Sequence, residues 1–438
     1  MKILKKIAWN AYLSIDGSHD KYKFCKQLKY IDYSEVQKKN LIELMCHCRK
    51  NVPFYSRIGD SSEFSYDEFR QIPLMSKDEI RANFDALIST DHHQRNSYKN
   101  SSGGSTGEPL VFIQDKLYSE WGRAVKSLYD SWSGLEPCDK QLRLWGSERD
   151  VVGQGLTIKQ RVVRWIKNEK WINTFTLDDK LLEEITVDIN KNNYKQITSY
   201  VDTAHELSRY ILRNNKIVDF NGSIITSAGT LFPEARKMIE NAMNCSVFNR
   251  YGSREVGDIA CSNLESNGLL VFSPIHFVEV LDNNGNPVSE GEIGEVIVTT
   301  LKNFSMPLIR YRIGDIAKVK KYNANGSVAV FESVEGRSTD LLKSVDGKTV
   351  LPAYFIHMFG VVEKKFSIKK IQFIQRSNLE IKIVVCFMEE IDKNMFEKIS
   401  SEIVCNVLGD VGLEVEYVSD IPKNRSGKFQ YVISHVNI

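Results

Sequence analysis

Residues 101–108, SSGGSTGE, combine three glycines, three serines and one threonine in eight positions, and the apolar run PLVFIQD follows. Glycine lets a backbone approach a ligand closely, and hydroxyl and backbone N–H groups donate hydrogen bonds, so this loop could wrap anionic oxygens. A Walker phosphate loop is excluded, because it needs Gly-Lys-Ser/Thr leading into a helix, whereas Glu108, Pro109 and a predicted strand follow Gly107. A flexible linker is disfavoured because apolar segments flank the loop. Taken alone, an ordinary Gly-Ser turn is equally compatible with the stretch.

Four later stretches place charged residues beside glycines: NRYGSREVGDIA at 249–260, PLIRYRIGDIAKV at 307–319, EGRSTDLLK at 335–343 and IPKNRSGKFQ at 421–430. They supply the candidate reactive residues, Glu255, Asp315, Arg337 and Lys428. Each one alone has an ordinary alternative. A Glu beside an Arg is usually a surface ion pair, an Asp after a glycine is usually a turn residue, and a lysine near a chain end is usually solvated.

In this order the five motifs resemble the adenylate-forming, AMP-producing ligase superfamily, and most of all its phenylacetate-CoA ligase branch with the CapK-type members from capsule and surface-polysaccharide gene clusters. The resemblance extends from CRKNVPFYSRI at 48–58 to Lys428, nearly the whole chain. It implies an enzyme that joins a carboxylic acid to ATP, releases pyrophosphate, and passes the acyl group from AMP to a thiol, usually that of CoA. Because a carboxylate must then attack a phosphorus bearing anionic oxygens, such a site needs positive charge and close positioning.

The resemblance also implies roles for individual residues. Glu255 would hold Mg²⁺, Asp315 would accept hydrogen bonds from both ribose hydroxyls, and Arg337 would contact the nucleotide from the domain junction. Lys428 would neutralise the carboxylate and the α-phosphate. The remaining nucleotide contacts are those of the phosphate loop and of the adenine pocket: Ser101, Ser102, Gly103, Gly104, Ser105, Thr106, Gly107, Ala228, Gly229, Thr230, Tyr251 and Gly252.

The sequence departs from the family pattern at three places. Many relatives have Lys where Glu108 stands, so phosphate charge must be offset elsewhere. The hinge position, commonly Asp, is Thr339, and Asp340 follows, so either Asp340 replaces it or the hinge is retuned. Some relatives bind zinc through two cysteines and a histidine. Here only Cys261 and, as a substitute histidine, His276 are available, so we expect no zinc.

The elements that must position these residues predict an α/β fold. Helical patterns cover 34–53, 76–88 and 116–132, and strands alternate with helices between 196 and 253 in the manner of a parallel sheet. Short strands after Gly268 indicate a small β lobe. We therefore expect an N-terminal AMP-binding domain at 1–336, with parallel sheet layers and this lobe, and a mobile α+β lid at 337–438.

Composition excludes other classes of protein. The 438 residues include 58 Lys and Arg against 56 Asp and Glu, so nucleic acid is not an expected partner. No apolar run is long enough to span a membrane, and the eight cysteines have no framework spacing, so we expect a cytoplasmic protein with reduced thiols. The amphipathic start MKILKKIAWNAYL could rest on a membrane surface, but a plain first helix is favoured.

These patterns predict an ATP-dependent carboxylic acid ligase that forms an acyl-AMP and then an acyl-CoA, with ATP, Mg²⁺ and CoA as cofactors. The sequence leaves two further points open: a role in surface-polysaccharide biosynthesis and a homodimeric state. Tyr200 and His205 could face the acid, although His205 is expected to be structural, because an ionised carboxylate needs no base. The alternatives are acyl transfer to an amine such as an amino sugar, and a nucleotide-binding protein without turnover.

Overall fold

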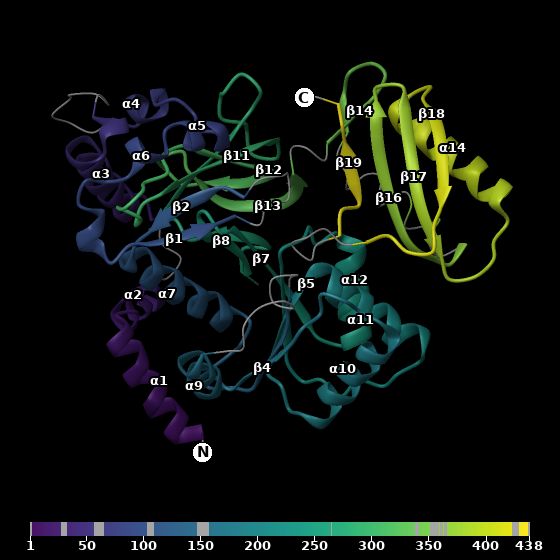
Figure 1. The fold of residues 1–438 in the computed structure, drawn as a ribbon, viewed down its shortest axis with the longest axis horizontal. Coiled ribbons are helices and arrows are strands. Elements are labelled where there is room, and N and C mark those ends of the chain that lie inside the picture. The colour runs from purple at the N-terminus through teal and green to yellow at the C-terminus, as the bar shows by residue number, and fades with distance from the viewer. Residues whose placement is uncertain are drawn as a thin grey trace.

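The computed structural model describes residues 2–27, 33–56, 65–102, 109–146, 157–263, 265–337, 341–350, 359, 362, 366–422 and 429–436. Within these ranges the chain forms a large mixed α/β body and a smaller C-terminal α+β body (Figure 1). This arrangement confirms the predicted fold class.

Most of the helices in the described ranges belong to the larger body. Several begin at the capping side chains that the sequence supplies: Asp115 caps α7, Thr157 caps α9, and Ser76 forms a capping box with Glu79 at α5. The helices of this body are α1 (Lys2–Asp16), α2 (His19–Gln27), α3 (Ser34–Asn51), α4 (Tyr66–Gln71), α5 (Lys77–Ala82), α6 (Phe84–Leu87), α7 (Lys116–Trp132), α9 (Ile158–Lys167), α10 (Asp179–Lys191), α11 (Val201–Arg213) and α12 (Pro233–Met243), with short 3₁₀ turns η1 (Pro53–Tyr55) and η2 (His92–Arg95).

One predicted helix differs in its bounds from the structure. The predicted helix 76–88 is broken at Asn83, whose φ of −117° and ψ of 22° are not helical, so α5 and α6 are separate. The helix predicted within 34–53, with Pro53 beyond its end, is confirmed as α3, which ends at Asn51 because Val52 before Pro53 is extended. The helix predicted at 116–132 is confirmed as α7.

One eleven-stranded sheet runs through the larger body, in the order β10-β11-β12-β13-β9-β8-β7-β6-β5-β3-β4. The strands from β7 to β4 are parallel and those from β7 to β10 are antiparallel, so β7 belongs to both halves. The expected β lobe is therefore continuous with the parallel layer. The strands are β3 (Gln141–Leu144), β4 (Glu169–Ile172), β5 (Gln196–Tyr200), β6 (Ser223–Ser227), β7 (Ser246–Ser253), β8 (Gly257–Asn263), β9 (Gly268–Val271), β10 (His276–Leu281), β11 (Ile293–Thr300), β12 (Tyr311–Tyr322) and β13 (Val328–Arg337).

Three smaller sheets complete the fold of the described ranges. The hairpin β1 (Tyr98–Ser101) and β2 (Val111–Gln114) flanks the Gly-Ser loop. The C-terminal body contains a four-stranded sheet, β18-β17-β16-β19, covered by α14 (Lys393–Leu408), and a short pair, β14 (Leu342–Lys343) and β15 (Thr349–Val350). The four strands are β16 (Ile368–Ser377), β17 (Glu380–Phe387), β18 (Gly412–Tyr417) and β19 (Val432–Ser434).

The larger body has separate apolar cores on the two halves of its sheet. Helices α10, α11 and α12 pack on the parallel strands, whereas α3 and the segments around α4 to α6 pack on the antiparallel strands. None of the helices in the described ranges is long and apolar enough to cross a membrane.

The buried imidazole of His276 links stability to pH. Its Nε2 lies 2.7 Å from the carbonyl oxygen of Val256, and burial lowers the pKa of His276 to about 4 from 6.5. The folded state therefore resists protonation that the unfolded chain accepts below about pH 6.5. We expect the free energy of unfolding to fall as the pH drops from 6.5 towards 4, and His276→Gln to flatten this slope in urea titrations. The matched change at the exposed His435, His435→Gln, should leave the slope as it is; equal slopes in both variants would contradict the assignment.

Candidate active site

The candidate site lies where the strands of the parallel half end. Tyr200 and Ser227 are the last residues of β5 and β6, and Tyr251 follows on the next strand, β7. In open α/β sheets, ligands bind outside the carboxyl ends of the strands. The segment after β6 turns sharply here, because Ala228 has a φ of +64°.

Three predicted residues meet in one polar cluster. The Tyr251 hydroxyl donates to Asp315 Oδ2 over 2.8 Å, and Arg337 Nε lies 3.1 Å from Asp315 Oδ1. Arg337 also donates from Nη1 to the carbonyl oxygen of Ile313 over 2.8 Å. The cluster forms because Asp315 on β12 stands opposite Arg337 on β13 in the strand register.

The cluster is electrostatically coupled. Asp315 raises the pKa of Arg337, and burial followed by Asp315 raises the pKa of Tyr251 well above its usual value. The Tyr251 ring also packs edge-on against Phe331, with 5.9 Å between the ring centres. Tyr251 thus lies in the apolar core and still presents its hydroxyl to Asp315.

The segment predicted to line the adenine pocket lies beside this cluster. Gly229 packs against the Val201 side chain, so closely that a Cβ at Gly229 would lie 3.1 Å from the Val201 Cβ. The Thr230 hydroxyl is next to Gly336, which precedes Arg337 and has a φ of +116°. Residues from the second half of the chain therefore converge on the end of β6, as the resemblance implied.

Glu255 occupies a tight turn between β7 and β8. Its side chain is buried, with 6% of the residue exposed, and among the described residues it has no ion-pair partner. The alternative of a surface pair with Arg254 is therefore wrong. Gln114, at the end of β2, donates from Nε2 to the carbonyl oxygen of Arg254 over 2.9 Å, which ties this turn to the hairpin of the Gly-Ser loop.

The described base of the Gly-Ser loop is closed by mutual bonds. The Ser102 N–H donates to the carbonyl oxygen of Leu110 over 2.9 Å, and the Leu110 N–H donates to Ser102 Oγ over 2.8 Å. Ser101 is the last residue of β1. The Gly-Ser loop therefore joins the two strands of a β-hairpin. This agrees with the exclusion of a Walker loop, which leads into a helix.

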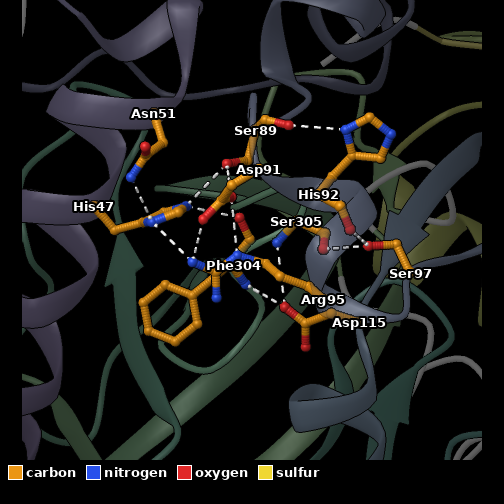
Figure 2. Close-up of polar contacts among 10 residues, drawn as sticks. All are labelled: His47, Asn51, Ser89, Asp91, His92, Arg95, Ser97, Asp115, Phe304 and Ser305. Atoms are coloured by element: carbon orange, nitrogen blue, oxygen red, sulfur yellow. Dashed lines mark hydrogen bonds and ion pairs between the residues drawn. The ribbon is translucent and has the colours of Figure 1, made fainter.

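A buried polar network fixes both stems of this hairpin (Figure 2). Ser97, just before β1, bonds through its hydroxyl to the Ser305 hydroxyl over 2.5 Å, and Asp115, just after β2, accepts from the Ser305 N–H over 3.2 Å. Asp115 also accepts from the Phe304 N–H over 2.8 Å. Both stems are thus held by one short segment of chain.

The same network extends to α3. His47 Nε2 lies 2.8 Å from the carbonyl oxygen of Phe304 and 3.2 Å from Ser89 Oγ (Figure 2). Asp91 accepts two bonds from Arg95, over 2.9 and 2.6 Å, which lower the pKa of the Asp91 carboxyl. The imidazole of His47 and the ion pair between Asp91 and Arg95 satisfy the polar groups of this network. Because each group has a partner, the network holds the base of the hairpin rigidly.

Sequence reasoning missed Lys77. This residue is half-buried, and its electrostatic neighbours are Arg337, Glu255 and Asp315; burial and then Arg337 lower its pKa. The backbone pairing of Met75 with Tyr311 brings the start of α5 to β12. A lysine in the first turn of a helix is unfavourable beside the helix dipole. This mismatch is the sequence signal that could have identified Lys77 as a candidate site residue. Lys77 is thus a cation beside the buried carboxylates.

The C-terminal body contacts helix α11. The Phe429 N–H donates to Asp202 Oδ2 over 2.8 Å, and Arg209 donates to the carbonyl oxygens of Lys369 and Ile368 over 2.6 and 2.5 Å. A cavity of about 50 Å³ between these elements includes His205 in its lining. His205 therefore faces the C-terminal body, and Tyr200 lies against Trp145 with 4.1 Å between ring centres.

Several predicted residues lie outside the described part of the chain. They are Gly103, Gly104, Ser105, Thr106, Gly107, Glu108, Thr339, Asp340 and Lys428. In the described part, no group of three or more His, Cys, Asp and Glu side chains could hold a metal ion, and Cys261 is a buried free thiol. The roles predicted for the residues outside the described part stay predictions.

Comparison with known proteins agrees with this geometry. Residues 342–435 match the CapK C-terminal domain family. The chain is 25% identical to protein CapK of Staphylococcus aureus, covering 92% of this chain and 90% of that protein, and 23% identical to the phenylacetate-coenzyme A ligase of Escherichia coli (strain K12), covering 73% and 74%.

Among solved structures, 2-hydroxyisobutyryl-CoA ligase in its postadenylation state, in complex with R3-HIB-AMP, matches with a TM-score of 0.69 and 17% identity, covering 93% of this chain and 91% of that chain. The same ligase in its thioesterification state, in complex with 2-HIB-AMP and CoA, matches with a TM-score of 0.56.

Fold and sequence point the same way: the chain has the fold of 2-hydroxyisobutyryl-CoA ligase. It is a homologue of CapK and of phenylacetate-CoA ligase, and its residues 342–435 match the CapK C-terminal domain family.

The turn that carries Glu255 depends on Gly252. A Cβ at Gly252 would lie 2.2 Å from the carbonyl oxygen of Gly257. We expect Gly252→Ala to lower the free energy of unfolding by about 1–3 kcal/mol, measured by urea denaturation, because the backbone must shift. Gly122→Ala is the matched control: Gly122 lies inside α7 with no atom within 4 Å of the new Cβ, so this variant should be stabilised by about 0.5–1 kcal/mol. Equal stability of Gly252→Ala and the wild type would refute the packing argument.

Proposed function

We propose that the protein activates a carboxylic acid with ATP and transfers the acyl group to CoA. In the first step a carboxylate oxygen bonds to the α-phosphorus of ATP and pyrophosphate leaves; in the second the CoA sulfur bonds to the acyl carbon, AMP leaves, and the thiol proton is released. The observation that carries the proposal is the cluster of Tyr251, Asp315 and Arg337 beside the buried Glu255 at the strand ends.

Asp315 is suited to hold the ribose. A carboxylate has lone pairs to spare after accepting from Tyr251 and Arg337, so both oxygens can accept ribose hydroxyls. The Tyr251 and Arg337 bonds fix the carboxylate before the nucleotide arrives. Pre-orientation of this kind lowers the entropic cost of binding.

Glu255 fits a magnesium ligand. It is a buried carboxylate without an ion-pair partner among the described residues, and carboxylate oxygen is a donor that Mg²⁺ prefers. When bound, Mg²⁺ neutralises phosphate charge. Lys77 supplies a cation near Glu255, which supports the idea that charge absent at Glu108 is offset elsewhere in the site.

The likeness to CapK along most of the chain supports a finer proposal, that the acyl group serves surface-polysaccharide biosynthesis. The pair of Trp145 and Tyr200 at the end of β5 supports placing the acid there. Access of a thiol then requires movement of the C-terminal body, whose residue Lys428 we assign to the first step alone.

The proposal predicts pyrophosphate release. With a panel of carboxylic acids, ATP and Mg²⁺, at least one acid should elicit pyrophosphate, and adding CoA should yield its thioester. Lys428→Ala should lower the rate of the first step by about 100-fold or more while keeping most of the ATP affinity, because it removes charge stabilisation in the transition state.

Two outcomes would count against the proposal. If no acid in the panel elicits pyrophosphate and Lys428→Ala binds ATP unchanged, the protein is a nucleotide-binding protein. If Glu255→Ala keeps its full magnesium-dependent turnover, the metal assignment is wrong. Replacing CoA by amines in the same assay separates the two acceptors.

The contact of Asp202 with Phe429 predicts a selective defect. The bond to Asp202 holds Phe429, the residue that follows Lys428 in the sequence, against α11. We expect Asp202→Ala to slow acyl-AMP formation by about ten-fold, while CoA-dependent consumption of supplied acyl-AMP is unchanged. Each half-reaction is measured separately by quenched-flow sampling.

The control is Glu184→Ala, which removes an exposed acid from the neighbouring helix α10. It should affect neither half-reaction. Equal losses in both half-reactions of Asp202→Ala would indicate general damage instead of misplacement of the C-terminal body.

A further inference from the structure

Helices α1 and α9 form one corner of the molecule, away from the C-terminal body (Figure 1). They pack together through Trp9, Leu13 and Ile166, which are buried. Lys5 joins them, because its Nζ donates to Asn168 over 2.8 Å and lies 5.2 Å from the Trp165 ring centre. The inner faces of both helices thus pack against each other and against the rest of the larger body.

Their outer faces are unusually apolar. Leu4 and Ile7 on α1 are 69% and 61% exposed, at a spacing that places them on one side of the helix. On α9, Ile158, Val162 and Trp165 recur at helical intervals and are 83%, 49% and 57% exposed. Surface helices normally turn polar residues to water, and clustered exposed apolar residues indicate an interaction site.

The charge of the two helices is equally one-sided. Between them α1 and α9 contain seven Lys and Arg and a single acid, whereas the whole chain has a formal net charge of +2. Of the seven, Lys5 is buried and Lys6 lies 3.5 Å from Glu136, so these two add little to the outward charge. Arg161 is exposed beside the apolar row of α9. Pairing with a second copy would bring like charges together, whereas an anionic surface complements them.

We propose that α1 and α9 form a docking surface for an anionic lipid bilayer, lying in its interface without crossing it. Apolar side chains that enter the acyl boundary beside Lys and Arg that meet anionic headgroups are the features of interfacial helices. Trp165 suits this position, because its ring is apolar and its N–H is polar. The surface, defined by Leu4, Ile7, Ile158, Val162 and Trp165, is independent of the catalytic proposal.

Vesicle flotation tests the docking surface. The full chain should float with vesicles of phosphatidylcholine and phosphatidylglycerol in equal parts, and should remain largely free with phosphatidylcholine alone. Arg161→Gln should weaken partitioning about five-fold, the equivalent of about 1 kcal/mol per cation near an anionic surface. The double variant Ile158→Ser/Val162→Ser should weaken it by about ten-fold or more, since buried apolar area is lost.

Matched controls lie elsewhere on the surface. Ile217 and Leu379 are 87% and 58% exposed, so Ile217→Ser/Leu379→Ser removes similar apolar area from other faces and should float like the wild type. Lys39→Glu, at an exposed position of α3, tests charge in the same way. Added salt should weaken binding, because the charged component is screened.

The inference is overturned if the wild type does not float with anionic vesicles, or if the α9 variants and their controls float alike while all melt at the same temperature. A change of sedimentation coefficient in Ile158→Ser/Val162→Ser, without any vesicle binding by the wild type, would assign the surface to a second copy instead.

Discussion

The ion pair between Arg337 and Asp315 is the interaction on which the site depends. It joins two neighbouring strands inside the antiparallel half, β12 and β13, and Tyr251 contacts it from β7, the strand that both halves of the sheet share. Arg337 is also the last residue of β13, after which the chain leaves for the C-terminal body. A shift of register by one residue would move Asp315 to the other face, so sheet pairing, the contact of Asp315 with Tyr251 and the departure point of the chain are set together.

The site gathers charge that a binding nucleotide must balance. Two carboxylates and two cations, Glu255, Asp315, Lys77 and Arg337, act on one another at close range, and the buried Tyr251 adds a polar group without charge. Lys77 has a lowered pKa, so its ammonium form is less stable in the unliganded protein than in water. Under the proposed binding of a nucleotide, an entering anion would favour the charged form of Lys77. Lys77 would then be one source of the positive charge that many relatives supply with a lysine at the position of Glu108.

Much of the fold was predictable because its signals are local. Asp115 and the apolar spacing after it define α7, and the order of motifs predicted that Tyr251, Asp315 and Arg337 would converge. What could not be predicted depends on contacts between distant segments. The joining of the parallel and antiparallel strands through β7, the position of Lys77 beside β12, and the bond from Phe429 to Asp202 all require the folded chain. For α1, the sequence favoured a plain first helix, and its packing against α9 through Trp9 and Leu13 also required the folded chain.

Helix α11 begins at Val201, directly after Tyr200 ends β5, with no loop between them. The residue against which Trp145 packs and the turn that holds Phe429 through Asp202 therefore belong to one stiff rod. On the proposed placement of the acid beside Tyr200, a change at this residue would be transmitted along the rod to the bond between Asp202 and Phe429. Recognition of the acid and attachment of the C-terminal body would then share one structural element.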